Sequence, residues 1–353
     1  MITVGTDIIG RKLIPALSDM AYDRLFVLCD AVVAEQHAER LAPICAITAP
    51  EDWHMVSGGE DLKLWQNCPP VWQWLSERGA SRHSILLCIG GGTVTDFGGF
   101  VASVYKRGIR TINLSTTLMG MVDASVGGKT GIDFSGIKNE IGSFHQPKAV
   151  FCDCAFLTTL PDRERLSGYA EVMKHALLIG QEAWQEAISF DLFSDDLVVW
   201  ESIVARSVAF KESIVVQDPL ESGLRRILNL GHTIGHAVES LSLRLLQENA
   251  ISHGHAVMIG LISELYHSVL THGLPRDILF TLVSWSKEYY PPFFFTCKQY
   301  PELTAYCHKD KKNKKGKIVL IPLRGVGQVG EPTEISEEIV HECLDFYREM
   351  LGG

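Results

Sequence analysis

The pattern of apolar residues changes near residue 160, and this change constrains the fold more than any other feature. Over the first 150 residues, short strand-like runs alternate with helical patterns: LFVLC ends before Asp30, ICAIT precedes Pro50 and SILLCIGGG ends at Gly92. Such alternation predicts βαβ units around a parallel sheet. Later, amphipathic helical patterns dominate, over residues 163–180, 196–216, 232–246 and 253–271. We therefore predict an α/β domain over residues 1–160 and a mostly helical domain over residues 161–353.

Length and charge limit the class of protein. A chain of 353 residues exceeds what one hydrophobic core usually organises, which supports two domains. The formal net charge of −10 argues against binding to nucleic acid or a membrane surface, because those partners attract basic proteins. No apolar run is long enough for a membrane span, and the nine cysteines form no CxxC pairs. We expect a cytoplasmic protein with reduced thiols.

Histidines are concentrated in one short part of the helical half. The strings GHTIGH and SHGH contain His232, His236, His253 and His255. His232 and His236 are four residues apart, so they share one face of a helix. Because neutral imidazole is the commonest protein ligand for a divalent cation, this clustering predicts a metal site.

A glycine-rich turn in the first half is suited to a phosphate. The string GGGTVTD, residues 90–96, follows an apolar strand and begins a helix, so backbone N–H groups can face an anion. A tight turn without a ligand is the alternative interpretation. Asp30, at the end of an early strand, can bond ribose hydroxyls. Glu60 and Lys63 can do the same or form a surface ion pair.

The segment 115–139 is rich in hydroxyls and glycines and also contains Asp123, Lys129 and Lys138. It has too much glycine for a plain helix, so we expect a loop that surrounds a ligand. A solvated loop is the simpler alternative.

Four further charged residues are ambiguous on their own. Lys106 and Arg107 precede a turn glycine and offer cations to a carboxylate or phosphate. Glu171 precedes Lys174 by about one helical turn, and in isolation it reads as an exposed helix charge. Their interpretation depends on what surrounds them.

Taken in order, these motifs resemble those of the 3-dehydroquinate synthase family, the shikimate-pathway branch of the sugar-phosphate cyclases. The likeness runs from about residue 59 to about residue 327. Its strings are GGE, GGGTVTD, YKRG, TTL, VDASVGGKT, KN, FLTTLP, YAEVMKH, LNLGHTIGHAVE, HGHAV and DKK. VDASVGGKT together with LNLGHT is highly specific, whereas a lone GGG or DKK is weak evidence.

The resemblance implies a Rossmann-like NAD-binding domain, a helical metal-binding domain, an active site in the cleft between them and a homodimer. It implies that Glu171, His232 and His253 bind Zn²⁺ or Co²⁺ and leave coordination positions open for substrate. It assigns NAD binding to Asp30, Glu60, Lys63, Gly91, Gly92, Asp96, Thr116, Thr117, Lys129, Lys138 and Thr159.

The implied reaction converts 3-deoxy-D-arabino-heptulosonate 7-phosphate to 3-dehydroquinate and inorganic phosphate, a carbon–oxygen lyase step in aromatic amino-acid biosynthesis. NAD is regenerated in each turnover, through alcohol oxidation, phosphate elimination, reduction and aldol ring closure. The resemblance places Lys129, Lys211 and Arg225 near the substrate carboxylate. It places the other catalytic residues near the phosphate and hydroxyls: Lys174, Asn229, His236, Lys311, Asn139, Asp123 and, from a neighbouring subunit, Arg107.

The chain departs from the family's usual pattern at two positions. HGHAV replaces HGEAV, which puts His255 where an acidic residue is usual, and Ser115 replaces a proline before TTL. On a helix His255 points to a different face from His253, so it should leave His253 at the metal. It could still alter the contacts that orient His253, and hence metal affinity and its pH dependence.

Three alternatives remain. Another sugar-phosphate cyclase, of the valiolone, aminodehydroquinate or deoxy-inosose type, would use the same NAD and metal, but Arg225, Asn229 and Lys211 disfavour a substrate without a carboxylate. A metal-dependent alcohol or glycerol dehydrogenase would release NADH, and VDASVGGKT and DKK disfavour it. A non-catalytic descendant would not need every reactive position filled. Individually, Lys211 and Arg225 could be surface charges and His236 a core histidine.

Overall fold

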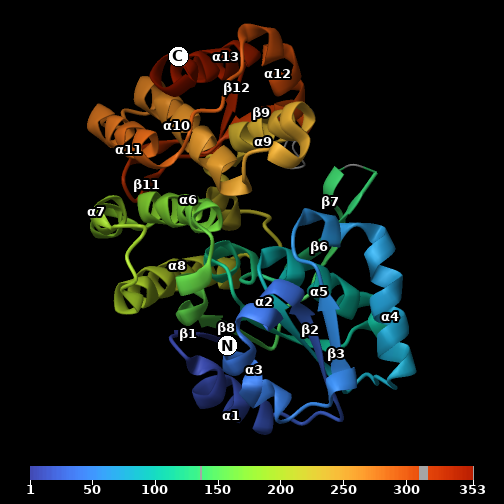
Figure 1. Cartoon of the computed structure of the whole chain (residues 1–353). Helices are drawn as coiled ribbons and strands as arrows, with labels where there is room; N and C mark the ends of the chain where they lie inside the picture. Colours follow the sequence, from blue (N-terminus) through green and yellow to red (C-terminus); the bar gives the residue numbers. More distant parts are fainter. Residues whose placement is uncertain (136, 310–316, 353) are drawn as a thin grey trace. The chain divides into compact units, whose positions relative to one another are not determined.

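The computed structural model describes residues 1–135, 137–309 and 317–352. The chain divides into two compact units (Figure 1). The first contains Met1–Pro161 and Asp195–Ser213, and the second contains Asp162–Ser194 and Ile214–Gly353. The break after Pro161 lies beside the boundary that the sequence predicts. The segment Asp195–Ser213 groups with the first unit, although the predicted ranges assign it to the second.

A six-stranded parallel sheet forms the centre of the first unit, with the order β1-β8-β5-β4-β2-β3. Its inner strands are buried apolar runs, as expected where helices cover both faces of a parallel sheet. The strands are β1 Ile2–Gly5, β2 Leu25–Asp30, β3 Trp53–Val56, β4 Ile85–Gly90, β5 Arg110–Ser115 and β8 Ala149–Asp153. The parallel sheet and its early strands confirm the predicted α/β fold of this half.

The helices of the first unit pack on this sheet. Helix α5 contacts β2, β4 and β5, and its Phe97 and Val101 join one core with Val71 and Leu75 of α4. The helices are α1 Ile14–Ser18, α2 Ala31–Gln36, α3 Ala38–Cys45, α4 Cys68–Glu77 and α5 Gly92–Val104. Helix α8, Leu197–Gln217, belongs to the first unit as far as Ser213.

Two predictions for the first half are wrong. The run ICAIT is the end of α3 and a following turn, because Leu41 and Ile44 bury one face of that helix; the strand comes later, as β3. The segment 115–139 is not a loop throughout. Its second half enters an antiparallel hairpin of β6, Lys129–Phe134, and β7, Ile137–Phe144, which packs on α5 through the buried Ile132.

The second unit is mostly helical, as predicted. Helix α10 is buried along most of its length and contacts α6, α9, α11 and α13. The helices are α6 Asp162–Ile179, α7 Gln181–Ser189, α9 His232–Leu246, α10 His253–Thr271, α11 Arg276–Tyr289, α12 Tyr300–Lys309 and α13 Glu337–Tyr347. The four predicted helices are confirmed as α6, α8, α9 and α10. Short strands follow: β9 Ile318–Leu320, β10 Leu323–Gly325, β11 Gln328–Val329 and β12 Thr333–Ile335.

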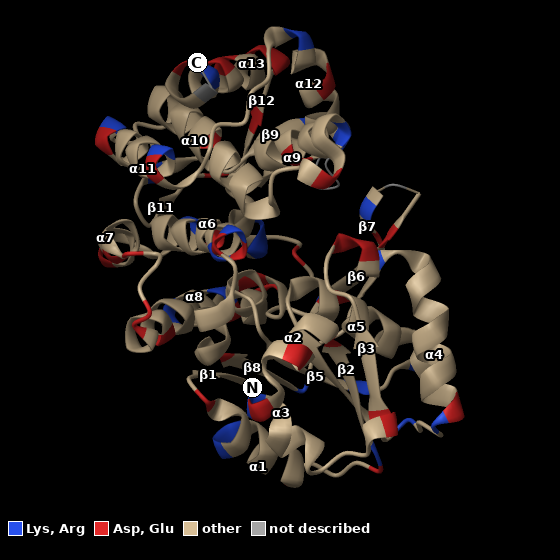
Figure 2. Ribbon diagram, viewed as in Figure 1, with Lys and Arg blue, Asp and Glu red and all other residues tan. Residues whose placement is uncertain are grey.

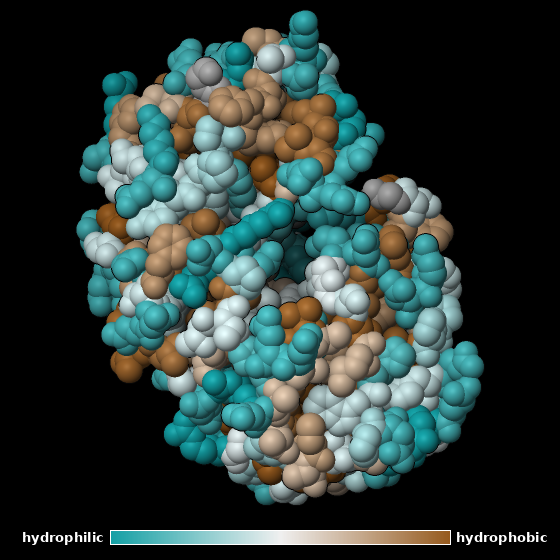
Figure 3. Space-filling view, in the orientation of Figure 1, coloured by the Kyte–Doolittle hydropathy of each residue, from teal (hydrophilic) through white to brown (hydrophobic). Residues whose placement is uncertain are grey.

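Hydrophilic side chains cover most of the face shown in Figure 3, and apolar side chains form small scattered patches there. Among the residues that the structure describes, no helix combines the length and apolar character that a membrane crossing requires.

Candidate functional site

The carboxyl ends of β2 and β4 form one edge of the sheet in the first unit, and the predicted NAD-binding residues Asp30 and Gly91 lie there. From β2, the chain adds β3 on one side of the sheet and then β4, β5 and β8 on the other. Parallel α/β sheets bind ligands where the strand order reverses in this way. Cys29 pairs with Ile89, so Asp30 and Gly90 end neighbouring strands at the same edge.

The residues at this edge suit a dinucleotide. Helix α5 begins at Gly92 after Gly91, and its first N–H groups have no acceptor within the helix. A Cβ on Gly91 would lie 2.9 Å from the methyl group of Thr117, so glycine keeps the space between them open. The N–H of Thr116 donates to the carbonyl of Gly90 at 3.0 Å. The Asp30 carboxylate caps α2 by accepting the N–H of Val32 at 3.0 Å.

Lys63 joins the 3₁₀ turn Glu60–Lys63 to the β6–β7 hairpin. Its ammonium is buried, lies 3.0 Å from Asp96 and donates to Asn139. Burial would lower the pKa of Lys63, but the carboxylates of Asp96 and Glu60 raise it above its usual value, so Lys63 is cationic. Glu60 pairs with Lys138 of β7 at 3.5 Å. Figure 2 shows acidic and basic residues side by side on this hairpin.

Two further contacts hold predicted site residues within the first unit. Lys211 of α8 is buried, and its Nζ lies 2.6 Å from Asp123 Oδ1. It is therefore not a surface charge. Thr159 Oγ1 lies 2.8 Å from His37 Nε2 at the end of the 3₁₀ segment Cys154–Thr159.

Three helices of the second unit bring the predicted metal ligands together: Glu171 lies on α6, His232 begins α9 and His253 begins α10. Glu171 Oε1 is 3.3 Å from His232 Nε2 and 3.8 Å from His253 Nε2. Glu171 is fully buried, and among the described residues its oxygens accept no well-aligned hydrogen bond. A carboxylate facing two imidazole nitrogens in this way fits a divalent cation, which would draw the three atoms to about 2 Å from itself.

The charge of Glu171 is fixed by its neighbours. Burial would raise the pKa of this carboxyl, but the ammonium of Lys174 and the imidazole of His232 hold it well below its usual range. Glu171 is therefore a buried anion, and not the exposed helix charge that its sequence position alone suggests. A buried anion of this kind requires cationic partners.

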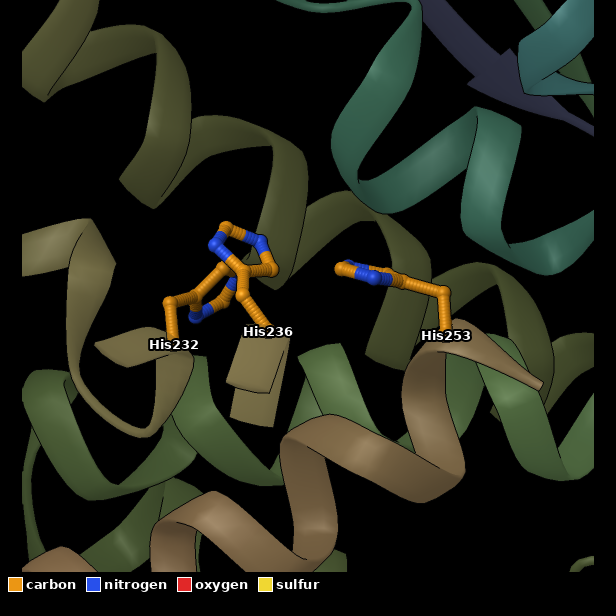
Figure 4. Close-up of side chains that lie close together, drawn as sticks. All are labelled: His232, His236 and His253. Atoms are coloured by element: carbon orange, nitrogen blue, oxygen red, sulfur yellow. The ribbon is translucent and has the colours of Figure 1, made fainter. Parts of the chain in front are cut away.

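The two histidines are held so that their Nε2 atoms face Glu171. His232 Nδ1 lies 3.1 Å from the carbonyl of Leu230, and His253 Nδ1 lies 3.1 Å from Glu239 Oε2. With the proton on Nδ1, each ring donates to that oxygen and keeps the Nε2 lone pair for a metal. His236 lies beside both, with one ring nitrogen of each of the three histidines within 4.8 Å of the others (Figure 4).

Close helix packing sets the separation of these ligands. A Cβ on Gly254 would lie 1.8 Å from the carbonyl oxygen of Ser167 on α6, and one on Gly260 would lie 1.8 Å from that of Gly231, before α9. Only glycine fits at these two positions of α10. Helix α10 therefore approaches its two partner helices through backbone contacts, and no side chain separates them.

A buried carboxylate anchors the start of α9. Glu264 of α10 is almost inaccessible to solvent and accepts the N–H groups of Gly231, Thr233 and Ile234 at 2.9–3.2 Å. These are amides that the first turn of a helix leaves without acceptors. The anchor fixes the backbone that carries His232.

The turn before α9 holds two more predicted residues. Asp218 accepts the N–H groups of Gly223 and Arg225 at 2.7 and 3.0 Å. Burial would raise the pKa of Asp218, but these N–H groups lower it to about 2. Arg225 is buried and donates to the carbonyl of Pro219, and Asn229 donates to Glu221, both at 2.9 Å. Arg225 is therefore not a surface charge.

Comparison with known proteins identifies the family. The family models described as 3-dehydroquinate synthase N-terminal and 3-dehydroquinate synthase C-terminal match residues 53–167 and 168–313. The chain belongs to the 3-dehydroquinate synthase family. The 3-dehydroquinate synthase of Parabacteroides distasonis is 46% identical over 344 residues, which cover 95% of this chain and 94% of that protein.

Two solved structures of synthases share the fold. The 2-epi-5-epi-valiolone synthase of Streptomyces hygroscopicus subsp. jinggangensis 5008, with NAD⁺ and Zn²⁺ bound, has a TM-score of 0.87 at 24% identity. The 2-deoxy-scyllo-inosose synthase complexed with carbaglucose-6-phosphate, NAD⁺ and Co²⁺ has a TM-score of 0.83 at 22% identity. Each match covers 99% of this chain and 96% of the other chain. The predicted 3-dehydroquinate synthase-like architecture is thereby confirmed.

His255, where the sequence departs from the pattern that the resemblance implies, is buried. His255 lies on α10 with its ring 5.1 Å from that of Tyr290, and burial lowers the pKa of His255 to about 4. The carboxylate that contacts His253 is Glu239, at the end of the motif LNLGHTIGHAVE. Its spacing of seven from His232 was a signal in the sequence, because it repeats the same helix face.

Three predicted residues remain: Lys129, Arg107 and Lys311. Lys129 is exposed on β6. Arg107 is exposed in a tight turn with φ 68°. Lys311 lies outside the described residues.

Proposed function

We propose that this chain converts 3-deoxy-D-arabino-heptulosonate 7-phosphate to 3-dehydroquinate and inorganic phosphate. The proposal rests on the convergence of Glu171, His232 and His253 in a member of the 3-dehydroquinate synthase family. The 46% identity to a curated 3-dehydroquinate synthase over nearly the whole chain favours this substrate among those of the related cyclases.

In this proposal Glu171, His232 and His253 hold Zn²⁺ or Co²⁺, and three protein ligands leave room for substrate oxygens. When bound, the metal polarises a substrate alcohol and NAD accepts and later returns a hydride. Lys174 keeps Glu171 ionised and contributes positive charge toward the phosphate. His236 shares the helix face of His232 and is proposed to bind the phosphate end.

The NAD site is proposed at the carboxyl edge of β2 and β4. Asp30 would accept ribose hydroxyls, and the start of α5 at Gly91 and Gly92 would receive the pyrophosphate. The paired charges at the β6–β7 hairpin would complete the site. The other proposed NAD contacts are Glu60, Lys63, Asp96, Thr116, Thr117, Lys129, Lys138 and Thr159.

Buried cations support a substrate with a carboxylate. The planar guanidinium of Arg225 can hold two carboxylate oxygens at once, and Lys211 and Lys129 are proposed to assist it. A valiolone- or inosose-type substrate would lack this partner. Asp123 would bond substrate hydroxyls, and Asn139, Asn229 and Lys311 would bond the phosphate. The departing phosphate can accept the proton itself, so no separate protein base is assigned to its elimination.

We also propose that the enzyme acts as a homodimer in the cytoplasm. Lys106 and Arg107 both adopt left-handed backbone conformations, with φ 48° and 68°. Such conformations cost about 1–3 kcal/mol each and are retained mainly where they serve a function. The turn displays Arg107 at the surface, where it could reach the substrate phosphate of a neighbouring subunit.

The test is phosphate release from the purified protein with substrate, NAD and Zn²⁺. We expect release without accumulation of NADH, and we expect His232→Ala to abolish it while leaving the protein folded. His83→Ala, at an exposed histidine, is the control. No phosphate release with Zn²⁺, Co²⁺ or Fe²⁺ would refute the proposal, and stoichiometric NADH would indicate a polyol dehydrogenase. Faster turnover of a substrate without a carboxylate would indicate another cyclase.

A further inference from the structure

A buried carboxylate on α9 contacts one of the proposed metal ligands from behind. Glu239 is 6% exposed, and its Oε2 lies 3.1 Å from His253 Nδ1. Glu239 lies seven residues after His232, so both project from the same face of α9. Helix α9 thus carries one proposed ligand, His232, and also contacts another, His253, which belongs to α10.

The two histidines depend on different kinds of support. The Nδ1 of His232 faces the backbone carbonyl of Leu230, which the turn before α9 supplies, and the first residues of α9 are anchored by Glu264. His253 has a side chain that is 32% exposed, so packing alone leaves its ring less constrained. The contact between His253 Nδ1 and Glu239 holds the ring with Nε2 on the side of Glu171.

The charge of Glu239 also matters. A carboxylate that accepts the Nδ1 proton fixes the tautomer of a histidine and makes Nε2 a stronger donor to a metal. Glu171 contributes one negative charge to the proposed site, and Lys174 offsets it with a positive charge. A second carboxylate behind His253 adds negative potential, which favours a divalent cation.

We infer that Glu239 is a positioning residue for the metal ion. It orients His253 and strengthens its bond to the ion, without itself touching metal or substrate. This inference rests on the proposed ligand set of Glu171, His232 and His253. Outer contacts of this kind are typically worth 10–100-fold in metal affinity.

The experiment measures Zn²⁺ affinity of the full chain by competition with a chromophoric chelator. We expect Glu239→Ala to bind Zn²⁺ 10–100-fold more weakly than the wild type. Glu239→Gln keeps an acceptor for the Nδ1 proton and loses the charge, so its loss should be smaller. We expect the visible spectrum of the Co²⁺-loaded protein to shift in Glu239→Ala and to return toward wild type in Glu239→Gln. Glu248→Ala removes an exposed carboxylate just after α9 and should change neither property.

The possible outcomes distinguish a wrong role for Glu239 from a wrong set of metal ligands. If His232→Ala loses Zn²⁺ but both Glu239 variants bind it with wild-type affinity, the ligand set holds and the inference is wrong. If His232→Ala binds Zn²⁺ normally, the ligand set itself fails. If Glu239→Ala unfolds at a lower temperature but keeps wild-type Zn²⁺ affinity and an unchanged Co²⁺ spectrum, Glu239 is only structural and the inference is again wrong.

Discussion

Replacing Gly254 by alanine should destroy the metal site through the backbone, although no ligand is altered. The added Cβ would lie 1.8 Å from the carbonyl oxygen of Ser167, about 1.6 Å inside ordinary van der Waals contact. That atom belongs to the backbone of α6, so no flexible side chain can move away. Relief requires α10 to move from α6, and with it the adjacent His253.

The size of this displacement can be compared with the size of a coordination sphere. His253 Nε2 is 3.8 Å from Glu171 Oε1, and movement along the line between them would take the two atoms to about 5.4 Å. Two ligands of one Zn²⁺ ion lie no more than about 4.4 Å apart, because each bond is about 2.0–2.2 Å long. The pair could then no longer share an ion.

We expect Gly254→Ala to lower Zn²⁺ affinity by more than about 100-fold, beyond the usual effect of a lost outer contact. Overpacking should also lower the free energy of unfolding by about 1–3 kcal/mol. Chelator competition and urea denaturation measure these two quantities. Gly10→Ala is the control, since its Cβ would have no atom within 4 Å. A folded Gly254→Ala protein that binds Zn²⁺ as tightly as the wild type would refute the reasoning.

Three further predictions concern single carboxylates. Glu264→Ala leaves three buried N–H groups of α9 without an acceptor and should lower the free energy of unfolding by at least about 2 kcal/mol in urea denaturation. Asp30→Ala should weaken NAD binding about 10-fold and admit NADP, as measured by calorimetry. Asp218 has a pKa of about 2 when folded against its ordinary 3.8, so its contribution to stability is complete above pH 3.8 and is lost as the pH falls toward 2. Asp218→Asn should remove that part of the acid unfolding profile.

One result would contradict each of these three predictions. Wild-type urea stability of Glu264→Ala would mean that the amides of α9 find other acceptors. Unchanged selectivity for NAD in Asp30→Ala would move the ribose site elsewhere. Identical acid unfolding of the wild type and Asp218→Asn would show that the carboxylate is not held by its backbone donors when folded.

The fold was predictable where one periodicity held over a long segment. Helices α6, α8, α9 and α10 and the strands at β2 and β4 follow directly from apolar spacing. The strand predicted at ICAIT was wrong because a short apolar stretch at the end of a helix cannot be distinguished from a strand by its composition. The β6–β7 hairpin was not predicted, because its pairing depends on packing against α5, which no local pattern encodes.

The candidate site was predictable only in part from residue spacing. His232 and His236 follow from helical geometry, but the assignment of Glu171 and His253 came from family resemblance, since a lone acid in a helix resembles a surface charge. Glu264 was missed for the same reason, and Glu239 was missed although its spacing of seven from His232 places it on the same helix face. Their function depends on burial between helices distant in sequence, and burial is a property of the folded chain.

The positions of His232 and His253, each the first residue of a helix, have an electrostatic consequence. A helix start carries roughly half a positive elementary charge. Two such starts therefore weaken the binding of a cation nearby and strengthen the binding of an anion. Carboxylates around the histidines offset the first effect. If the proposed site holds an ion and a substrate oxygen beside it, the second effect would favour the anionic form of that oxygen. The two helix starts would then lower the affinity for the ion and raise the acidity of a group bound next to it.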